Sequence, residues 1–196
     1  FEELLGHFPM DTPRYELGAG LYDRLAPVDS GAGLLLVLPI PDRALPRCLK
    51  SDVVYLDGVQ DPGNVGAIIR TSAAAGIEHV FAAAGTASLW SPKVLRAGMG
   101  AHFRMGLHER VAPRQLAGVL DGIWIAAVAH EAPSLWEQSF PQGAVGWIFG
   151  AEGTGASSEA LAASHGRVRI PTSGNVESLN VAAAAAVCLF ERLRRR

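Results

Sequence analysis

The chain has 196 residues, of which 49% are hydrophobic and 18% are charged, and its formal net charge is −2. This hydrophobic content excludes a disordered chain and allows one good-sized domain with a substantial core. Because the net charge is slightly negative, any affinity for nucleic acid must come from a local basic patch. The sequence has no apolar run that would span a membrane and no secretory pattern, and Cys48 and Cys188 lack metal or disulfide spacing, so we expect a cytoplasmic protein without a metal site.

Residues 1–51 are expected to be an end piece and not a complete domain. The sequence predicts the tail of a helix over residues 1–8, a buried strand over Leu34–Leu38, and a connecting segment marked by Pro39, Pro41 and Pro46. One obvious strand is too little to close a core. Because the first residue is Phe and not Met, we expect a trimmed chain or a fragment.

Strands and helices alternate from Asp52 onward. The apolar runs predict strands over residues 53–56, 79–83, 123–128, 145–149 and 168–170. The helical periodicity and its start signals predict helices over residues 64–75, 91–99, 113–121, 157–164 and 178–194. This alternation predicts a parallel sheet covered by helices on both faces. Ligands of such sheets bind beyond the carboxyl ends of the strands.

Three segments occupy such strand ends. The first segment, Leu56–Thr71, carries Asn64, which is a potential helix N-cap, and Arg70, which lies off the apolar face of its helix. The second segment, Ile148–Ser157, resembles a phosphate-binding loop, but Ala156 stands where that loop needs lysine, and the carboxylate of Glu152 would repel phosphates.

The third segment, Ile170–Asn180, leaves a short strand through a proline and enters an Ala-rich helix. Ser178 and Asn180 can each cap the free backbone N–H groups at the start of that helix, which would explain both residues without any ligand. The same position would also place their side chains beside a ligand at the sheet edge.

Taken together, the three segments resemble in order and spacing the motifs of the SpoU class of RNA ribose 2′-O-methyltransferases, within the SPOUT superfamily. The resemblance implies an α/β fold with a C-terminal deep trefoil knot, S-adenosylmethionine as cofactor and a homodimer. By matching position, the implied catalytic residues are Asn64, Arg70, Glu152, Ser178 and Asn180. The implied cofactor-binding residues are Gly150, Ile170 and Leu179, which act largely through backbone groups and apolar contact with the adenine.

The implied reaction transfers a methyl group to a ribose 2′-hydroxyl, a weak acid that must be aligned and lose its proton. The family assigns Arg70 as the base, yet lowering an arginine pKa from ~12.5 to ~8 costs about 6 kcal/mol. Our hypothesis is that Arg70 orients an RNA phosphate and stabilises the developing alkoxide, with Glu152 fixing either Arg70 or its own loop.

The resemblance further implies ribosomal RNA as the preferred substrate and transfer RNA as the next. It assigns residues 1–51 to the end of an N-terminal RNA-recognition domain and residues 52–196 to the catalytic domain. One alternative is a catalytically silent RNA-binding assembly factor, which would be expected to have lost some of the five catalytic residues. Another is a dinucleotide-binding oxidoreductase, but the first strand is not followed by Gly-x-Gly-x-x-Gly.

Two basic stretches and one histidine remain open. A group of cations between Ser91 and Arg114, opposed by Glu109 alone, is either a solvated face or an RNA contact: Lys93, Arg96, Arg104, Arg110 and Arg114. The C-terminal arginines 192, 194, 195 and 196 suit a helix end. His102 is expected to be structural, with a place beside the cofactor as the alternative.

Overall fold

The computed structural model describes residue 3 and residues 6–26, 33–174 and 178–196. The chain divides into two units, Phe1–Pro39 and Ile40–Arg196. None of the helices in the described part of the chain is long and apolar enough to cross a membrane.

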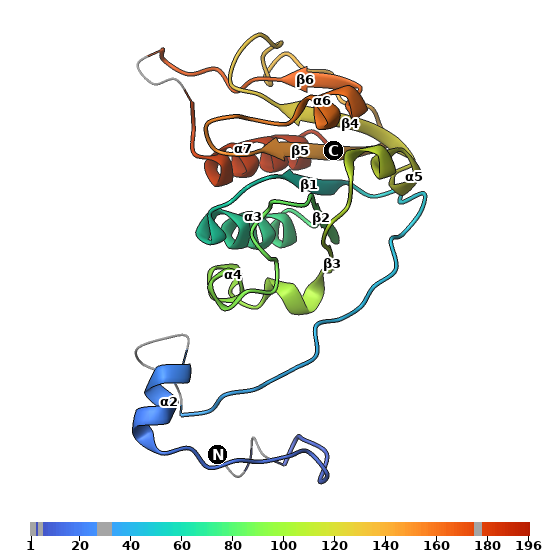
Figure 1. Cartoon of the computed structure of the whole chain (residues 1–196). Helices are drawn as coiled ribbons and strands as arrows, with labels where there is room; N and C mark the ends of the chain where they lie inside the picture. Colours follow the sequence, from blue (N-terminus) through green and yellow to red (C-terminus); the bar gives the residue numbers. More distant parts are fainter. Residues whose placement is uncertain (1–2, 4–5, 27–32, 175–177) are drawn as a thin grey trace. The chain divides into compact units, whose positions relative to one another are not determined.

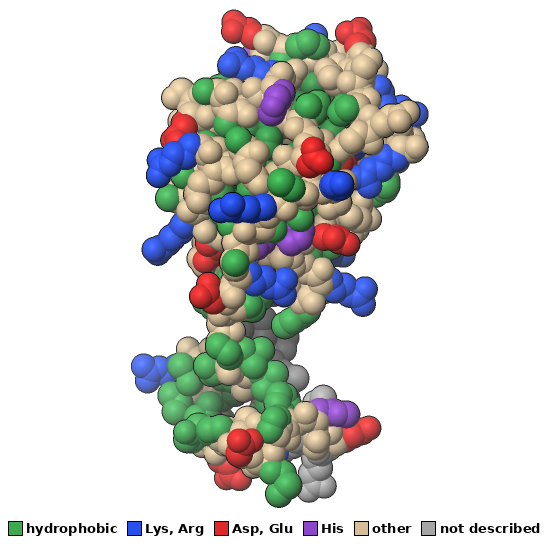
Figure 2. Space-filling model, turned by 90° about the vertical axis from the view of Figure 1, so that its right-hand side faces the viewer, with side chains coloured by type: hydrophobic (Ala, Val, Ile, Leu, Met, Phe, Trp, Pro, Cys, Tyr) green, Lys and Arg blue, Asp and Glu red, His purple; other side chains and the backbone are tan. Residues whose placement is uncertain are grey.

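The described residues of the first unit contain one complete helix, α2 (Ala19–Leu25), none of whose residues is buried. The strand predicted over Leu34–Leu38 is wrong, because these residues have no strand structure and Val37 is 98% exposed. An apolar run becomes a buried strand only when a neighbouring strand or helix covers it. Figure 2 shows hydrophobic side chains gathered on the surface of this unit. The helix predicted over residues 1–8 lies partly outside the described residues.

The second unit is built on a six-stranded parallel sheet with the order β3-β2-β1-β5-β4-β6 (Figure 1). Its strands are β1 (Val53–Asp57), β2 (His79–Ala82), β3 (Gly106–His108), β4 (Gly122–Ala127), β5 (Ala144–Gly150) and β6 (Gly166–Val168). The predicted parallel sheet is therefore confirmed. The short edge strand β3 was missed, and β6 ends where the predicted strand begins.

Helices cover both faces of the sheet. They are α3 (Pro62–Ala74), α4 (Pro92–Gly98), α5 (Leu116–Val119), α6 (Ser158–Ala163) and α7 (Val181–Arg194), with 3-10 helices η1 (Ala101–Arg104) and η2 (Pro113–Gln115). Alternate side chains of the central strands point to opposite faces, so β1 sends Val54 and Leu56 toward α3 and α7 but Val53 and Tyr55 toward α5 and α6.

The C-terminal arginines fasten the end of α7 to the sheet. The buried Arg192 pairs with Asp52 at 3.1 Å and donates to the carbonyl oxygens of Pro141 and Gly143. Arg196 reaches the same carboxylate at 2.7 Å. Asp52 also accepts from the backbone N–H of Val145, so β5 and α7 are tied together at the amino end of the sheet.

Candidate functional site

The first segment places Asn64 inside α3 and not at its cap. Asp61 is the N-cap residue and accepts from the backbone N–H of Asn64 at 2.7 Å, while Pro62 opens the helix. The predicted capping role of Asn64 is therefore wrong, because the acceptor is supplied three residues earlier. As a result, the Asn64 side chain is available to the residues opposite the helix start.

The second segment forms a tight glycine loop between β5 and α6. A backbone bridge joins Ala151 to Gly155, whose φ of +72° suits glycine. A Cβ on Gly150 would lie 2.0 Å from the backbone nitrogen of Ala156, so only glycine fits there. Asp57, at the end of β1, accepts from the N–H of Ser157 at 2.6 Å and holds the far end of the loop. The loop thereby fixes the backbone of Glu152.

The third segment leads into α7, which begins at Val181 after its N-cap Asn180, three residues later than the predicted helix begins. The Asn180 Oδ1 accepts from the backbone N–H groups of Ala182 and Ala183 at 2.9 and 3.2 Å. Its predicted capping role is thus confirmed. Ser178 is exposed, and its hydroxyl caps nothing within the described part of the chain. Residues 175–177 of this segment lie outside the described residues.

Side chains from all three segments meet in one hydrogen-bonded chain. Asn64 Nδ2 donates to Glu152 Oε1 at 2.7 Å, and Asn64 Oδ1 accepts from Asn180 Nδ2 at 3.0 Å. The other carboxylate oxygen of Glu152 accepts from the N–H of Gln60 at 3.4 Å. These contacts of Glu152 join the glycine loop to the first segment and do not involve Arg70.

A cavity of about 590 Å³ lies beside this chain of side chains. All three predicted cofactor-binding residues line it, namely Gly150, Ile170 and Leu179, together with Glu152, Ser178 and Asn180. Its volume lies within the range of about 300–1,000 Å³ of small-molecule sites. The lining combines apolar side chains of Phe149, Leu161 and Val181 with the backbone of the glycine loop.

One wall of this cavity was not predicted from the sequence: residues 127–130, at the carboxyl end of β4 and just after it. A single histidine, His130, follows Ala127, Val128 and Ala129 there and forms no recognisable motif, but β4 pairs with both β5 and β6, so its carboxyl end must adjoin theirs. The available signal was thus the order of strands, which the sequence alone did not provide.

Arg70 does not join the other predicted catalytic residues within one chain. It is exposed on α3, and no described residue forms a hydrogen bond or ion pair with it. It lies six positions after Asn64, so the two side chains point about 120° apart around the helix. It instead lies one turn beyond Gly66, where α3 packs closely against Val94 and Ala97 of α4.

His102 is structural, as expected. Its ring is buried, Nε2 lies 2.8 Å from the carbonyl oxygen of Leu89, and a Cβ on Gly98 would lie 2.4 Å from the ring. Burial lowers the pKa of His102 below its usual value, with the Leu89 contact opposing this effect. His102 does not line the 590 Å³ cavity.

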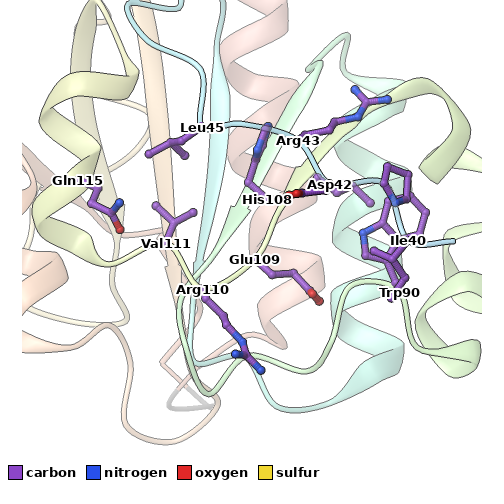
Figure 3. A pocket seen from close by; sticks show the side chains of 12 residues that line it. Ile40, Asp42, Arg43, Leu45, Trp90, His108, Glu109, Arg110, Val111 and Gln115 are labelled. Atoms are coloured by element: carbon purple, nitrogen blue, oxygen red, sulfur yellow. The ribbon is translucent and has the colours of Figure 1, made fainter.

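A second cavity of about 350 Å³ lies at the β3 edge of the sheet. Figure 3 shows Arg43 and Arg110 at its two ends, with Asp42 and Glu109 between them. Its charges therefore balance. His108 lines it and contacts His79 through Nε2 at 3.2 Å; burial, with the neighbouring His79 and Arg43, lowers the pKa of His108 to about 4.

Comparison with known proteins identifies relatives for most of the chain. The sequence profile of the SpoU rRNA Methylase family matches residues 51–190. The 23S rRNA (guanosine(2553)-2'-O)-methyltransferase RlmP of Bacillus subtilis (strain 168) is 29% identical over 177 residues, which cover 90% of this chain and 71% of that protein. Across such curated relatives the chain spans between 53% and 71% of their length.

Solved structures agree with this match. The SpoU methyltransferase AviRb from Streptomyces viridochromogenes in complex with AdoMet, which is S-adenosylmethionine, is 26% identical with a TM-score of 0.70, covering 81% of this chain and 63% of that one. A second solved structure, which concerns the 2-OH methylation of C/U34 on tRNA, is 30% identical with a TM-score of 0.65, and the match covers 74% of this chain and 96% of that one.

Proposed function

This chain belongs to the SpoU rRNA methylase family, and from that premise we propose that it transfers a methyl group from S-adenosylmethionine to a ribose 2′-hydroxyl of structured RNA. The observation that carries the proposal is the hydrogen-bonded chain from Glu152 through Asn64 to Asn180. Three segments far apart in the sequence converge there beside a cavity of cofactor size. A merely structural role would not require polar side chains from three separate segments to meet beside a cavity.

The residues around the cavity fit the proposed cofactor. Ile170 and Leu179 offer apolar contact to a purine ring, and the glycine loop, whose shape leaves no room for a side chain at Gly150, offers backbone hydrogen-bonding groups. Glu152 lines the cavity, and its negative charge suits a positively charged group nearby. When bound, S-adenosylmethionine supplies a methyl group on a positively charged sulfur.

The protein's own residues would align the acceptor hydroxyl and assist its deprotonation. The bond between the sulfur and the methyl carbon breaks as the ribose O2′–carbon bond forms, and the hydroxyl proton leaves. Asn64 and Ser178 would position groups of the substrate, and Asn180 and Glu152 would hold Asn64 in its orientation. We propose that Arg70 binds an RNA phosphate and stabilises the developing alkoxide, with the proton passing to a phosphate oxygen or to water.

The proposed role of Arg70 is tested by the pH–rate profile of Arg70→Lys. A lysine retains the positive charge but loses the bidentate geometry for phosphate. We expect a large loss of rate and no new titration. Good activity that titrates near the lysine pKa would instead establish position 70 as the base.

We propose ribosomal RNA as substrate, with transfer RNA next, because relatives of both kinds carry this domain. We also propose a homodimer, since Arg70 is remote from the other site residues of its own chain.

For the fold, we propose that the third segment forms the trefoil knot of the superfamily. Residues 1–51 are proposed as the end of an RNA-recognition domain and residues 52–196 as the catalytic domain. We propose that the protein acts in the cytoplasm, where these RNAs are modified.

Calorimetric titration of S-adenosylmethionine into the wild type and Asn180→Ala tests the proposed cofactor, with NADH as the control ligand. We expect one saturable site per chain, weakened by the substitution, and no binding of NADH. Absence of S-adenosylmethionine binding by a demonstrably folded chain would contradict the enzyme assignment and favour an RNA-binding assembly factor of the same fold.

A further inference from the structure

The surface formed by α4 and η1 combines exposed cations with exposed hydrophobic side chains. Its residues, which we call the α4–η1 surface, are Lys93, Arg96, Met99, Phe103 and Arg104. Phe103 is 76% exposed and Met99 70% exposed, although both are large and apolar. Leaving such side chains in water is unfavourable relative to burying them. Their exposure indicates that another molecule covers them.

Charge identifies the kind of molecule. Lys93, Arg96 and Arg104 are exposed, and none of them forms an ion pair within the described part of the chain. The stretch from Ser91 to His108 contains no Asp or Glu, and the next acid, Glu109, is engaged by Ser88 and the N–H of Leu89. The α4–η1 surface is therefore positive, unlike the charge-balanced cavity of Figure 3. A polyanion complements it better than a protein face of mixed charge.

The backbone presents the apolar side chains outward. Met99 ends α4 in the left-handed conformation with φ of +47°, which is unusual for a residue other than glycine, and Gly100 continues the turn at +84°. This turn starts η1, which carries Phe103 and Arg104. Aromatic rings and arginines exposed together are the side chains on which unpaired bases stack while phosphates are neutralised.

The position of the surface relates it to the proposed reaction. Gly66 allows α4 to pack against α3, because a Cβ there would lie 2.4 Å from the Cβ of Ala97. Arg70 lies one helical turn beyond this contact, on the same side of α3. An RNA phosphate held by Arg70 would thus bring the neighbouring nucleotides to α4 and η1.

We propose that the α4–η1 surface binds unpaired nucleotides of the substrate RNA that flank the methylated one, with Phe103 and Met99 contacting bases and Lys93, Arg96 and Arg104 contacting phosphates. The inference rests on the proposed function. A second copy of the chain is a poorer occupant, because a two-fold contact centred on this surface would place three cations against three cations.

Fluorescence anisotropy with a labelled, mixed-sequence single-stranded RNA oligonucleotide tests the inference. Phe103→Ala should weaken binding by roughly 5- to 150-fold, whereas Phe103→Tyr, which can still stack, should bind like the wild type. The double variant Arg96→Gln with Arg104→Gln should reduce the slope of log affinity against log salt by about 1.4. The matched control, Arg47→Gln with Arg114→Gln, removes two exposed arginines outside the surface and should change the affinity much less.

Two further measurements keep the outcomes distinct. Titration of S-adenosylmethionine into the same variants should give the wild-type affinity. If the wild type binds both the cofactor and RNA, and the surface variants bind RNA equally well, this inference alone is overturned. A wild type without cofactor binding would contradict the proposed function, and the anisotropy would still report on the surface. No RNA binding by the wild type at low salt, or a change of oligomeric state by light scattering with unchanged RNA affinity, would also overturn the inference.

Discussion

Asn180 performs two roles with two different atoms. Its Oδ1 caps α7, and its Nδ2 donates to Asn64. The two roles separate in a pair of variants. Asn180→Asp retains the cap but loses the donor, so we expect near wild-type stability and a rate of methyl transfer reduced by about tenfold, the effect of one lost hydrogen bond. Asn180→Ala loses both and should also be destabilised by about 1 kcal/mol.

Thermal unfolding and single-turnover kinetics of the two variants provide the comparison. If Asn180→Asp were as active as the wild type, the contact with Asn64 would have no part in the reaction, and Asn180 would be a helix cap only.

His108 gives the protein a pH-dependent stability. Its pKa falls from its usual value near 6.5 to about 4 in the folded chain, mainly through burial. Between these values the unfolded chain binds a proton that the folded chain does not, so the free energy of unfolding falls as the pH falls, by up to about 3 kcal/mol at pH 4. Above pH 6.5 this contribution does not change.

Chemical denaturation from pH 7.5 to 4.5 measures this slope. We expect His108→Gln to flatten it, even if its stability at pH 7.5 is lower, whereas His7→Gln at an exposed position should keep the wild-type slope. An unchanged slope in His108→Gln would assign the acid sensitivity to other groups.

At the residue scale, the structure brings together several of the residues that the resemblance singles out. Glu152, Asn64 and Asn180 form one hydrogen-bonded chain, and Gly150, Ile170 and Leu179 line one cavity. The capping role of Asn64 was wrong because α3 begins earlier: Asp61 is its N-cap and accepts from the backbone N–H of Asn64, which therefore lies inside the helix. Arg70 lies apart from this cluster because it is six positions after Asn64 on one helix, a spacing that places the two side chains on different sides of the helix and that can be read from the sequence.

At the scale of elements, the glycine loop between β5 and α6 is the part of the site that tolerates substitution least. We expect Gly150→Ala to displace the loop, since the added Cβ would meet backbone atoms of Gly155 and Ala156, and to weaken S-adenosylmethionine binding by at least about tenfold. The control Gly118→Ala adds a methyl group where no atom lies within 4 Å.

Calorimetry and circular dichroism separate loss of binding from loss of fold in these two variants. Wild-type affinity in a folded Gly150→Ala protein would mean that the loop yields without consequence, and that the cavity is not the cofactor site.

The strands and helices show what kinds of element the sequence predicts well. Central strands such as β1 and β5 are buried on both faces, so their continuous apolar runs identified them. The edge strand β3 has three residues and no such run, and residues 34–38 have the run but no covering element. Apolar character alone therefore does not distinguish a buried strand from an exposed segment, because the partner lies elsewhere in the chain.

At the scale of the whole molecule, the buried pair of Arg192 and Asp52 joins the last helix to the sheet. Arg192→Met removes the buried cation and its hydrogen bonds to the carbonyl oxygens of Pro141 and Gly143, and leaves Asp52 with Arg196 as its remaining cationic partner, so we expect a destabilisation of about 2–3 kcal/mol. Arg194→Gln, which breaks an exposed pair with Glu191, should change stability far less.

Urea denaturation of Arg192→Met, Asp52→Asn and their double variant, with Arg194→Gln as the control, measures the coupling between the two buried partners. A loss in Arg192→Met no larger than that in Arg194→Gln would show that the C-terminal arginines are not needed to fasten α7.

The central claim is methyl transfer to a ribose 2′-hydroxyl. Its most direct test is to incubate the chain with unmodified ribosomal and transfer RNA and with S-adenosylmethionine carrying a deuterated methyl group, and then to identify labelled nucleosides by mass spectrometry, with Arg70→Ala as the control. We predict the label on a ribose 2′-oxygen, at one position and strongly reduced in the control. Label on a base, or no label from a chain that binds both the cofactor and the RNA, would contradict the account.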